Sequence, residues 1–178
     1  MSRIIVISGV PGAGKSTLAG LLAAHFERSV HLEADQFQKM IVNGGRWPEN
    51  DNVEGMRQLR LRSKNVGLVA DSFFAENFTT IVDDIYIGDR FYHLLEDILC
   101  PRLYFVLLVP NLAQLKTRNE QRRNKNVFHQ SEALYQITLN ETPKQGLWID
   151  TSTHSVEQSL QVILSRYEKE ALLIRENS

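Results

Sequence analysis

The chain has 178 residues, a length that suits one domain burying about 70% of its unfolded surface around a single core. Its formal net charge of −1 excludes a protein that holds nucleic acid or anionic membranes by overall charge. One cysteine, Cys100, excludes an internal disulfide and a cysteine-based metal site. No apolar run approaches the ~20 residues of a membrane span, and no hydrophobic signal region precedes the first strand, so we expect a cytoplasmic protein.

The first predicted strand, at residues 3–8, leads directly into a glycine-rich loop. This loop matches G-x-x-x-x-G-K-[ST] at every fixed position, with the sequence Gly9-Val10-Pro11-Gly12-Ala13-Gly14-Lys15-Ser16. The residues after it predict a helix over 15–27. A buried strand before the motif and a helix after it are the context that separates a phosphate-binding P-loop from an incidental glycine-rich turn.

The chemistry of a P-loop follows from its backbone. Its glycines let consecutive N–H groups turn inward around an anion, and the helix N-terminus adds partial positive charge at the same point. Lys15 would reach the β- and γ-phosphates, and the Ser16 hydroxyl is a ligand for a magnesium ion that keeps most of its waters. The residues predicted to contact the nucleotide here are Gly9, Gly12, Ala13, Gly14, Lys15, Ser16 and Thr17.

The second predicted strand, at 30–35, ends in the acidic residue Asp35. Because ligands of open α/β sheets bind at the carboxyl ends of the strands, this carboxylate is expected to face a phosphate on the P-loop. A short helix is predicted at 36–42, and the loop at 43–52 has the length of segments that close on ligands. We expect the region 36–77 to determine specificity for a second substrate.

A helix is predicted at 53–77, and most of its basic residues are expected to form a solvated face: Arg57, Arg60, Arg62 and Lys64. The following strand, at 79–87, carries the adjacent carboxylates Asp83 and Asp84 and resembles a Walker B element. Successive strand residues point to opposite faces, so one of the two should face the metal, and we favour Asp83. The alternative is that one or both cap the following turn or helix.

The next predicted elements are a helix at 88–99, a strand at 101–110 and a helix at 112–123. The far end of this last helix carries Arg118, Arg122 and Arg123 before a polar run. Cations in this position suit a lid, at about 118–130, that closes over phosphates and neutralises charge on the transferring group. The alternative is a charged helix end that stabilises its own dipole.

The remaining predicted elements are a helix at 131–142, a strand at 146–152 and a helix at 155–174. Ser155 and Gln158 fit a capping box at the start of the last helix. The β–α alternation predicts an α/β fold with a parallel sheet, right-handed crossovers and helices on both faces. The histidines lack the spacing of a metal site and are expected to be surface or packed residues, with His129 alone near the lid: His25, His31, His93, His129 and His154.

With these motifs, the chain resembles the small P-loop kinases that phosphorylate hydroxyl groups of low-molecular-weight substrates. It looks most like the chloramphenicol phosphotransferase-like group, with gluconate kinase and shikimate kinase as relatives. The resemblance covers nearly the whole chain and implies one domain at 1–178 with a three-layer P-loop NTPase fold, whose five-stranded parallel sheet has the order 2-3-1-4-5. It also implies ATP and Mg²⁺ as cofactors and transfer of the γ-phosphoryl group to an alcohol.

For the reacting groups, the resemblance assigns Asp35 as the carboxylate that accepts the proton of the substrate hydroxyl, and Lys15 as the lysine that bridges the phosphates. The chain lacks the sugar-acid-binding pattern of gluconate kinases after Asp35. It also departs from chloramphenicol phosphotransferase in its Trp47-Pro48 loop and in its helix of basic residues, so neither substrate is carried over.

For the nucleotide, Arg118 resembles the arginine that packs on adenine, and Arg122 or Arg123 the lid arginine over the transferred phosphate. The turn around 150–153, which contains Thr151, corresponds to the segment that lines the adenine pocket.

Three functions stay open on the sequence. The first is a small-molecule kinase, a monomer or homodimer without membrane contact, acting on an antibiotic, a sugar acid or a related metabolite. The second is a polynucleotide 5′-hydroxyl kinase, against which the net charge argues. The third is a toxin-like kinase of UDP-amino sugars or an ATP-binding regulatory switch, for which no sequence feature is diagnostic.

Overall fold

The computed structural model describes residues 1–48, 53–120 and 128–174. Its strands are β1 (Arg3–Gly9), β2 (Ser29–Glu33), β3 (Thr79–Asp83), β4 (Leu103–Leu108) and β5 (Leu147–Ile149). Its helices are α1 (Lys15–Ala24), α2 (Ala34–Lys39), α3 (Val53–Ala75), α4 (Arg90–Asp97), α5 (Leu112–Glu120), α6 (Phe128–Asn140) and α7 (Val156–Glu170). The predicted β–α alternation is confirmed, as is the capping box of Ser155 and Gln158 at the start of α7. In these ranges no helix has both the length and the apolar character needed to cross a membrane.

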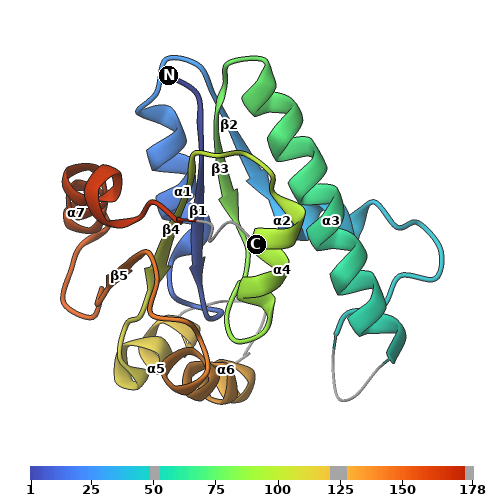
Figure 1. Cartoon of the computed structure of the whole chain (residues 1–178). Helices are drawn as coiled ribbons and strands as arrows, with labels where there is room; N and C mark the ends of the chain where they lie inside the picture. The colour runs from blue at the N-terminus through green and yellow to red at the C-terminus, as the bar shows by residue number, and fades with distance from the viewer. Residues whose placement is uncertain (49–52, 121–127, 175–178) are drawn as a thin grey trace.

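The strands form one sheet in the order β2-β3-β1-β4-β5, and every pairing between them is parallel. Helices α1 and α7 cover one face of this sheet and α3 and α4 cover the other (Figure 1). The three-layer P-loop NTPase fold and the strand order implied by the resemblance are therefore confirmed. Because β1 lies between β3 and β4, the loop that follows it lies in the middle of the carboxyl edge of the sheet, near α5 and α6 (Figure 1).

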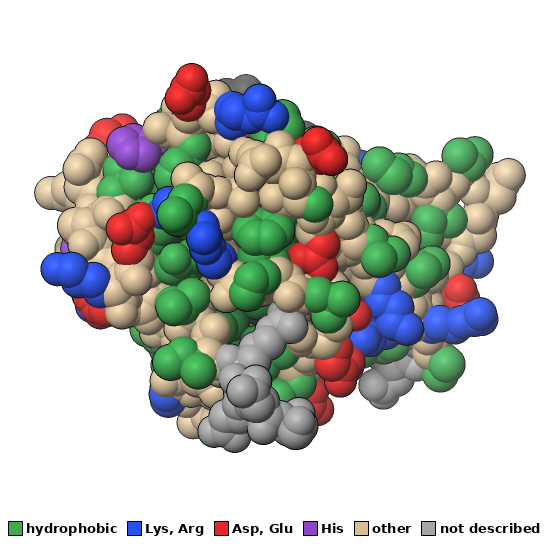
Figure 2. Space-filling view, turned by 45° about the horizontal axis from the view of Figure 1, so that its top comes forward, with side chains coloured by type: hydrophobic (Ala, Val, Ile, Leu, Met, Phe, Trp, Pro, Cys, Tyr) green, Lys and Arg blue, Asp and Glu red, His purple; other side chains and the backbone are tan. Residues whose placement is uncertain are grey.

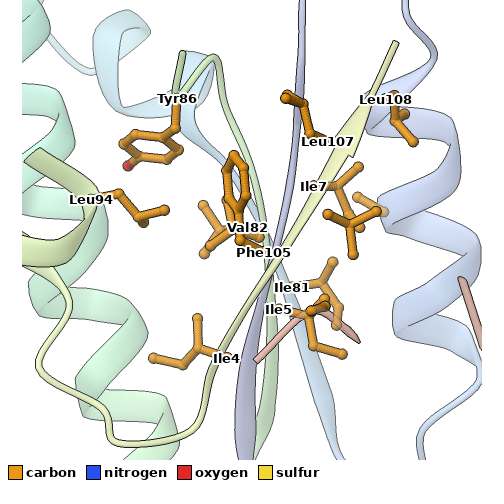
Figure 3. Packing of buried hydrophobic residues seen from close by; sticks show 14 of the residues in the cluster. Ile4, Ile5, Ile7, Ile81, Val82, Tyr86, Leu94, Phe105, Leu107 and Leu108 are labelled. Atoms are coloured by element: carbon orange, nitrogen blue, oxygen red, sulfur yellow. The ribbon is translucent and has the colours of Figure 1, made fainter. Parts of the chain in front are cut away.

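The core is built on the pleat of the central strands. Ile4 and Ile5 of β1 have no exposed surface, and they point to opposite faces of the sheet (Figure 3). Ile5 is the register partner of Ile81 on the α1 side, whereas Val82 lies on the α3 side with Ile4. Burial of each such side chain contributes about 1.5–3 kcal/mol, so the sheet is a stable platform for the loops at its carboxyl edge.

β2 to β5 all end earlier than the sequence predicts, and for β2 and β3 the change affects acidic residues. β2 ends at Glu33, so Asp35 lies in the first turn of α2 rather than on the strand. β3 ends at Asp83 because the next carboxylate, Asp84, accepts the N–H of Ile85 at 2.8 Å and so takes that donor out of the sheet ladder. Asp35 and Asp84 therefore lie just beyond the carboxyl ends of β2 and β3.

The prediction that most basic residues of α3 form a solvated face holds for only two of the four. Arg57 and Lys64 are exposed, as expected. Arg60 instead pairs with Glu96 and Asp97 near the end of α4, and Arg62 is only 5% exposed. The reason is that the buried face of α3 follows helical spacing through small and polar residues as well as apolar ones: Gly55, Gln58, Leu59, Arg62, Ser63, Val66, Gly67 and Ala70.

Candidate nucleotide and acceptor site

The P-loop connects β1 to α1 and has the backbone geometry of an anion-binding loop. Gly14 caps α1 in the left-handed conformation, with φ of 98°, and the N–H of Ala13 donates to the carbonyl of Val10 at 3.1 Å. The Lys15 ammonium donates to the same carbonyl at 3.2 Å. The lysine therefore lies along the loop, with its charge beside the start of α1, where an anion is favoured.

Residues of α5 and α6 pack against the P-loop. A Cβ atom on Gly12 would lie 2.8 Å from the side-chain nitrogen of Asn119, which is 1% exposed at the end of α5. Ser131 of α6 is fully buried and donates its hydroxyl to the carbonyl of Pro11 at 3.0 Å. Gly12 is thus required at this position both for its positive φ of 90° and for the close approach of Asn119.

Asp83 is on the P-loop side of the strand end. Its Oδ1 accepts the Ser16 hydroxyl at 3.1 Å, and its Oδ2 lies 2.6 Å from Nε2 of His31 on β2. These contacts bring together the two residues that we predicted to bind a metal ion, Ser16 and Asp83. The described part of the chain contains no cluster of three or more His, Cys, Asp or Glu side chains that could hold a metal ion by itself.

Asp84 contacts two arginines instead of Ser16. Its two oxygens accept Nη2 of Arg62 at 2.7 Å and Nη2 of Arg90 at 2.8 Å. Burial would raise the pKa of this carboxyl, but the two guanidinium groups and the N–H of Ile85 outweigh that effect and hold the pKa below its usual range. Asp84 is therefore a charged group inside the protein that fixes the two arginines.

Asp35 belongs to the same network. Nη1 of Arg62 donates to its Oδ1 at 3.0 Å, so one guanidinium group joins the buried Asp84 to Asp35, whose side chain is 64% exposed. Arg62 also lies with its guanidinium carbon 6.0 Å from the ring centre of Trp47, in the loop after α2 that projects from the body of the protein (Figure 1). This side of the site therefore has a fixed carboxylate and an aromatic side chain nearby.

A cavity of about 180 Å³ lies where these groups meet. It is lined by P-loop residues, by the three carboxylates and by Ile85: Pro11, Gly12, Gly14, Lys15, Ser16, Thr17, Asp35, Asp83, Asp84 and Ile85. A second cavity of about 190 Å³ lies on the other side of the loop, at the start of α7, and includes Arg118, Thr151 and His154 among its lining residues. Two neighbouring cavities thus share the P-loop residues Gly14 and Thr17.

Arg118 forms hydrogen bonds to two other residues that line the second cavity. Its guanidinium donates to the carbonyls of Ala13, at 3.1 Å, and Thr151, at 2.9 Å. The two residues predicted to line an adenine pocket are therefore in direct contact. Arg122 and Arg123, predicted as lid residues, lie outside the described residues.

Sequence reasoning missed three residues of the site: His31, Arg62 and Arg90. Arg62 had a detectable signal, because it stands three residues after Leu59 and four before Val66, on the stripe that helical spacing marks as buried. A charged residue on such a stripe needs a buried partner. His31 had no such signal, because its contact depends on the register between β2 and β3.

The structure is similar to several solved proteins at low sequence identity, and two of them are described as kinases. A sugar kinase from Janibacter sp. HTCC2649 is 21% identical and covers 96% of both chains, with a TM-score of 0.64. The tunicamycin resistance protein of Deinococcus radiodurans is 17% identical, with a TM-score of 0.68 over 98% of this chain and 100% of that one. The APS kinase CysC of Mycobacterium tuberculosis, solved with AMPPNP and APS, is 16% identical, with a TM-score of 0.64 over 94% and 98%. These likenesses establish a shared fold.

Comparison with curated proteins gives no match. The sequence does match the AAA domain family over residues 5–135. That span contains the P-loop, Asp35, the Asp83-Asp84 pair and Arg118, so the match covers most of the site. The chain therefore belongs to the AAA domain family, with a P-loop NTPase fold.

Proposed function

We propose that this protein is an ATP-dependent kinase that transfers the γ-phosphoryl group to a hydroxyl of a small molecule. One observation carries the proposal: Asp35, from α2, lines the same cavity as Lys15 and Ser16 of the P-loop. A phosphate-binding loop alone is compatible with hydrolysis or simple binding. A carboxylate at the same cavity adds the proton acceptor that a hydroxyl substrate needs. Neighbours described as a sugar kinase and an APS kinase share this fold and support the same interpretation.

The nucleotide would occupy both cavities. The P-loop N–H groups and the start of α1 would hold the β-phosphate, and Lys15 would exchange its contact with Val10 for the β- and γ-phosphates. The base would enter the second cavity, where Arg118 is already held by Ala13 and Thr151. A guanidinium fixed in this way can pack on the face of a purine without further ordering.

Ser16, at the start of α1, and Asp83, at the end of β3, fit a magnesium ion. Ser16 and Asp83 offer only oxygen atoms, and a site with few protein ligands suits an ion that keeps several waters and binds phosphate oxygens. When bound, Mg²⁺ would neutralise charge on the phosphate groups. In the protein, Asp83 keeps the Ser16 hydroxyl oriented next to the P-loop.

Asp35 would act on the acceptor. Its exposed carboxylate takes the proton of the acceptor hydroxyl as the oxygen forms a bond to the γ-phosphorus. The bond between that phosphorus and the β–γ bridging oxygen breaks, and ADP leaves with the electron pair. Arg62 orients the carboxylate from behind through its hydrogen bond to Oδ1. Positioning of the hydroxyl in line with the leaving oxygen supplies a large part of the rate enhancement.

The test is ADP release from ATP in the presence of Mg²⁺, with and without a panel of aminoglycosides, phenicols, sugar acids, nucleosides and UDP-amino sugars. Lys15→Ala provides the blank, and mass spectrometry of the accelerating compound detects the added phosphoryl group. Asp35→Asn should lower the acceptor-dependent rate about 100-fold or more while leaving the binding of ATP intact. Full turnover by Asp35→Asn would remove it as the base. ATP binding without acceleration by any hydroxyl compound would argue for a nucleotide switch.

The structure weighs against the polynucleotide alternative. Arg60 and Arg62, half of the basic set on α3, are paired with carboxylates, so they do not present free charge to a phosphate backbone. On the face that Figure 2 shows, basic and acidic side chains are interspersed among the described residues. A labelled oligonucleotide that bound with a steep salt dependence would reverse this preference.

A further inference from the structure

We propose that His31 is a positioning residue of the magnesium–nucleotide site: it holds the Asp83 carboxylate in the orientation that keeps its other oxygen on Ser16. The proposal rests on the proposed function, since it concerns the same nucleotide. Nε2 of His31 lies 2.6 Å from Oδ2 of Asp83, and Oδ1 of Asp83 accepts the Ser16 hydroxyl at 3.1 Å. The two oxygens of one carboxylate are thus divided between a histidine and the P-loop.

The sheet register places His31 where it can do this. β2 and β3 are parallel neighbours, with Glu33 opposite Asp83 and His31 opposite Ile81. Residues two apart on a strand point to the same face, so His31 and Asp83 are diagonal neighbours on one face of the sheet. The other edge of the imidazole lies against α1, where a Cβ atom on Gly20 would be 3.8 Å from Nδ1. The ring is therefore held between α1 and the carboxylate.

The direction of the hydrogen bond follows from the chemistry of the partners. An ionised carboxylate only accepts, so His31 donates the N–H of Nε2. Without that donor, the Asp83 carboxylate could rotate and offer either oxygen to water instead of to Ser16. Outer-shell hydrogen bonds of this kind orient metal-binding carboxylates, and their removal typically costs about 10–100-fold in metal affinity.

The experiment measures binding of a fluorescent ADP analogue, mant-ADP, to the full chain across a magnesium titration that starts in EDTA. For His31→Ala we expect the affinity in EDTA to stay within about twofold of wild type, because the P-loop is unchanged. The magnesium concentration that gives half of the magnesium-dependent increase in mant-ADP affinity should rise about 10–100-fold. His31→Gln, which keeps an N–H donor, should recover part of the loss and serves as the informative variant if the alanine protein does not fold. His25→Ala, an exposed histidine at the end of α1, is the control and should match wild type.

A double-mutant cycle with Asp83→Asn tests the route of the effect. If His31 acts through Asp83, adding His31→Ala to Asp83→Asn should produce little further loss. An unchanged magnesium titration in folded His31→Ala, or an equal loss of affinity in EDTA, overturns the assignment, because the first shows no role and the second a general structural one. If wild type binds no mant-ADP under either condition, the proposed function itself fails. A normal wild-type titration with an unaffected variant refutes His31 alone.

Discussion

Replacement of Asp84 by asparagine tests whether the buried arginine cluster is held by charge. The Asp84 side chain is 2% exposed and is shared by Arg62 and Arg90. Removal of one partner from a buried ion pair costs about 3–5 kcal/mol, because the remaining charge is left uncompensated. Asparagine still offers one acceptor oxygen and Arg62 keeps Asp35, so we expect the lower end, about 3 kcal/mol, which is about 6–12 °C in Tm for a chain of this size.

The assay is urea and thermal unfolding followed by circular dichroism at several pH values. Because the pKa of Asp84 is lowered in the folded state, its contribution is fully present above the unfolded pKa of about 3.9 and is lost as the pH falls through the folded pKa. The difference in the free energy of unfolding between wild type and Asp84→Asn should therefore stay at about 3 kcal/mol between pH 5 and pH 8. It should become smaller below about pH 4. Asp89→Asn, at an exposed position five residues later, should differ little from wild type. A gap under about 1 kcal/mol at pH 7 would refute the reasoning.

Two further substitutions, one of them with a matched control, test how the protein binds the nucleotide. Gly12→Ala places a Cβ atom 2.8 Å from Asn119 at a φ of 90°, so the backbone cost of about 1–2 kcal/mol and the clash together should weaken mant-ADP binding by more than about 5–30-fold. In Gly14→Ala the added Cβ atom meets no atom within 4 Å, so this variant should show only the loss of mant-ADP affinity that comes from backbone strain. An equal loss of affinity in both variants would show that contact with Asn119 has no role. Arg118→Ala should raise KM for ATP about 2–30-fold with kcat little changed, since the contact with the base is the same before and during transfer. A fall in kcat at unchanged KM, measured by steady-state ADP release, would place Arg118 at the reacting phosphate instead.

The parts of the fold that the sequence predicts are those set by local spacing. The P-loop motif is contiguous, its strand and helix flank it directly, and the capping box of Ser155 and Gln158 spans three residues. The strand order came from the resemblance to a kinase family rather than from the pattern of residues, because several orders satisfy a β–α alternation. Local signals therefore located the phosphate site, and family likeness placed it within the sheet.

The part of the site proposed for the acceptor was harder to predict because it depends on contacts between distant segments. Arg62 reaches Asp35, 27 residues away, and Asp84, 22 residues away, and both contacts depend on how α3 packs on the sheet. The hydrophobicity of the residues was also a poor guide to the buried face of α3, since Leu61 and Leu68 are exposed while Arg62 is buried. On a helix that covers a polar site, spacing identifies the buried face more reliably than hydrophobicity does.

The end of β3 divides a pair of adjacent carboxylates between two different sets of partners. Asp83 faces Ser16 and His31, whereas Asp84, one residue later, leaves the sheet ladder and faces two arginines. In the proposed reaction, the first would act on the nucleotide side, and the second would act through Arg62 on the carboxylate proposed to receive the acceptor proton. Each carboxylate is held by its own hydrogen bonds, so the positions of the two groups relative to each other are defined. In-line phosphoryl transfer depends on such defined positions, since a misplacement of about 1 Å can cost about 100-fold in rate.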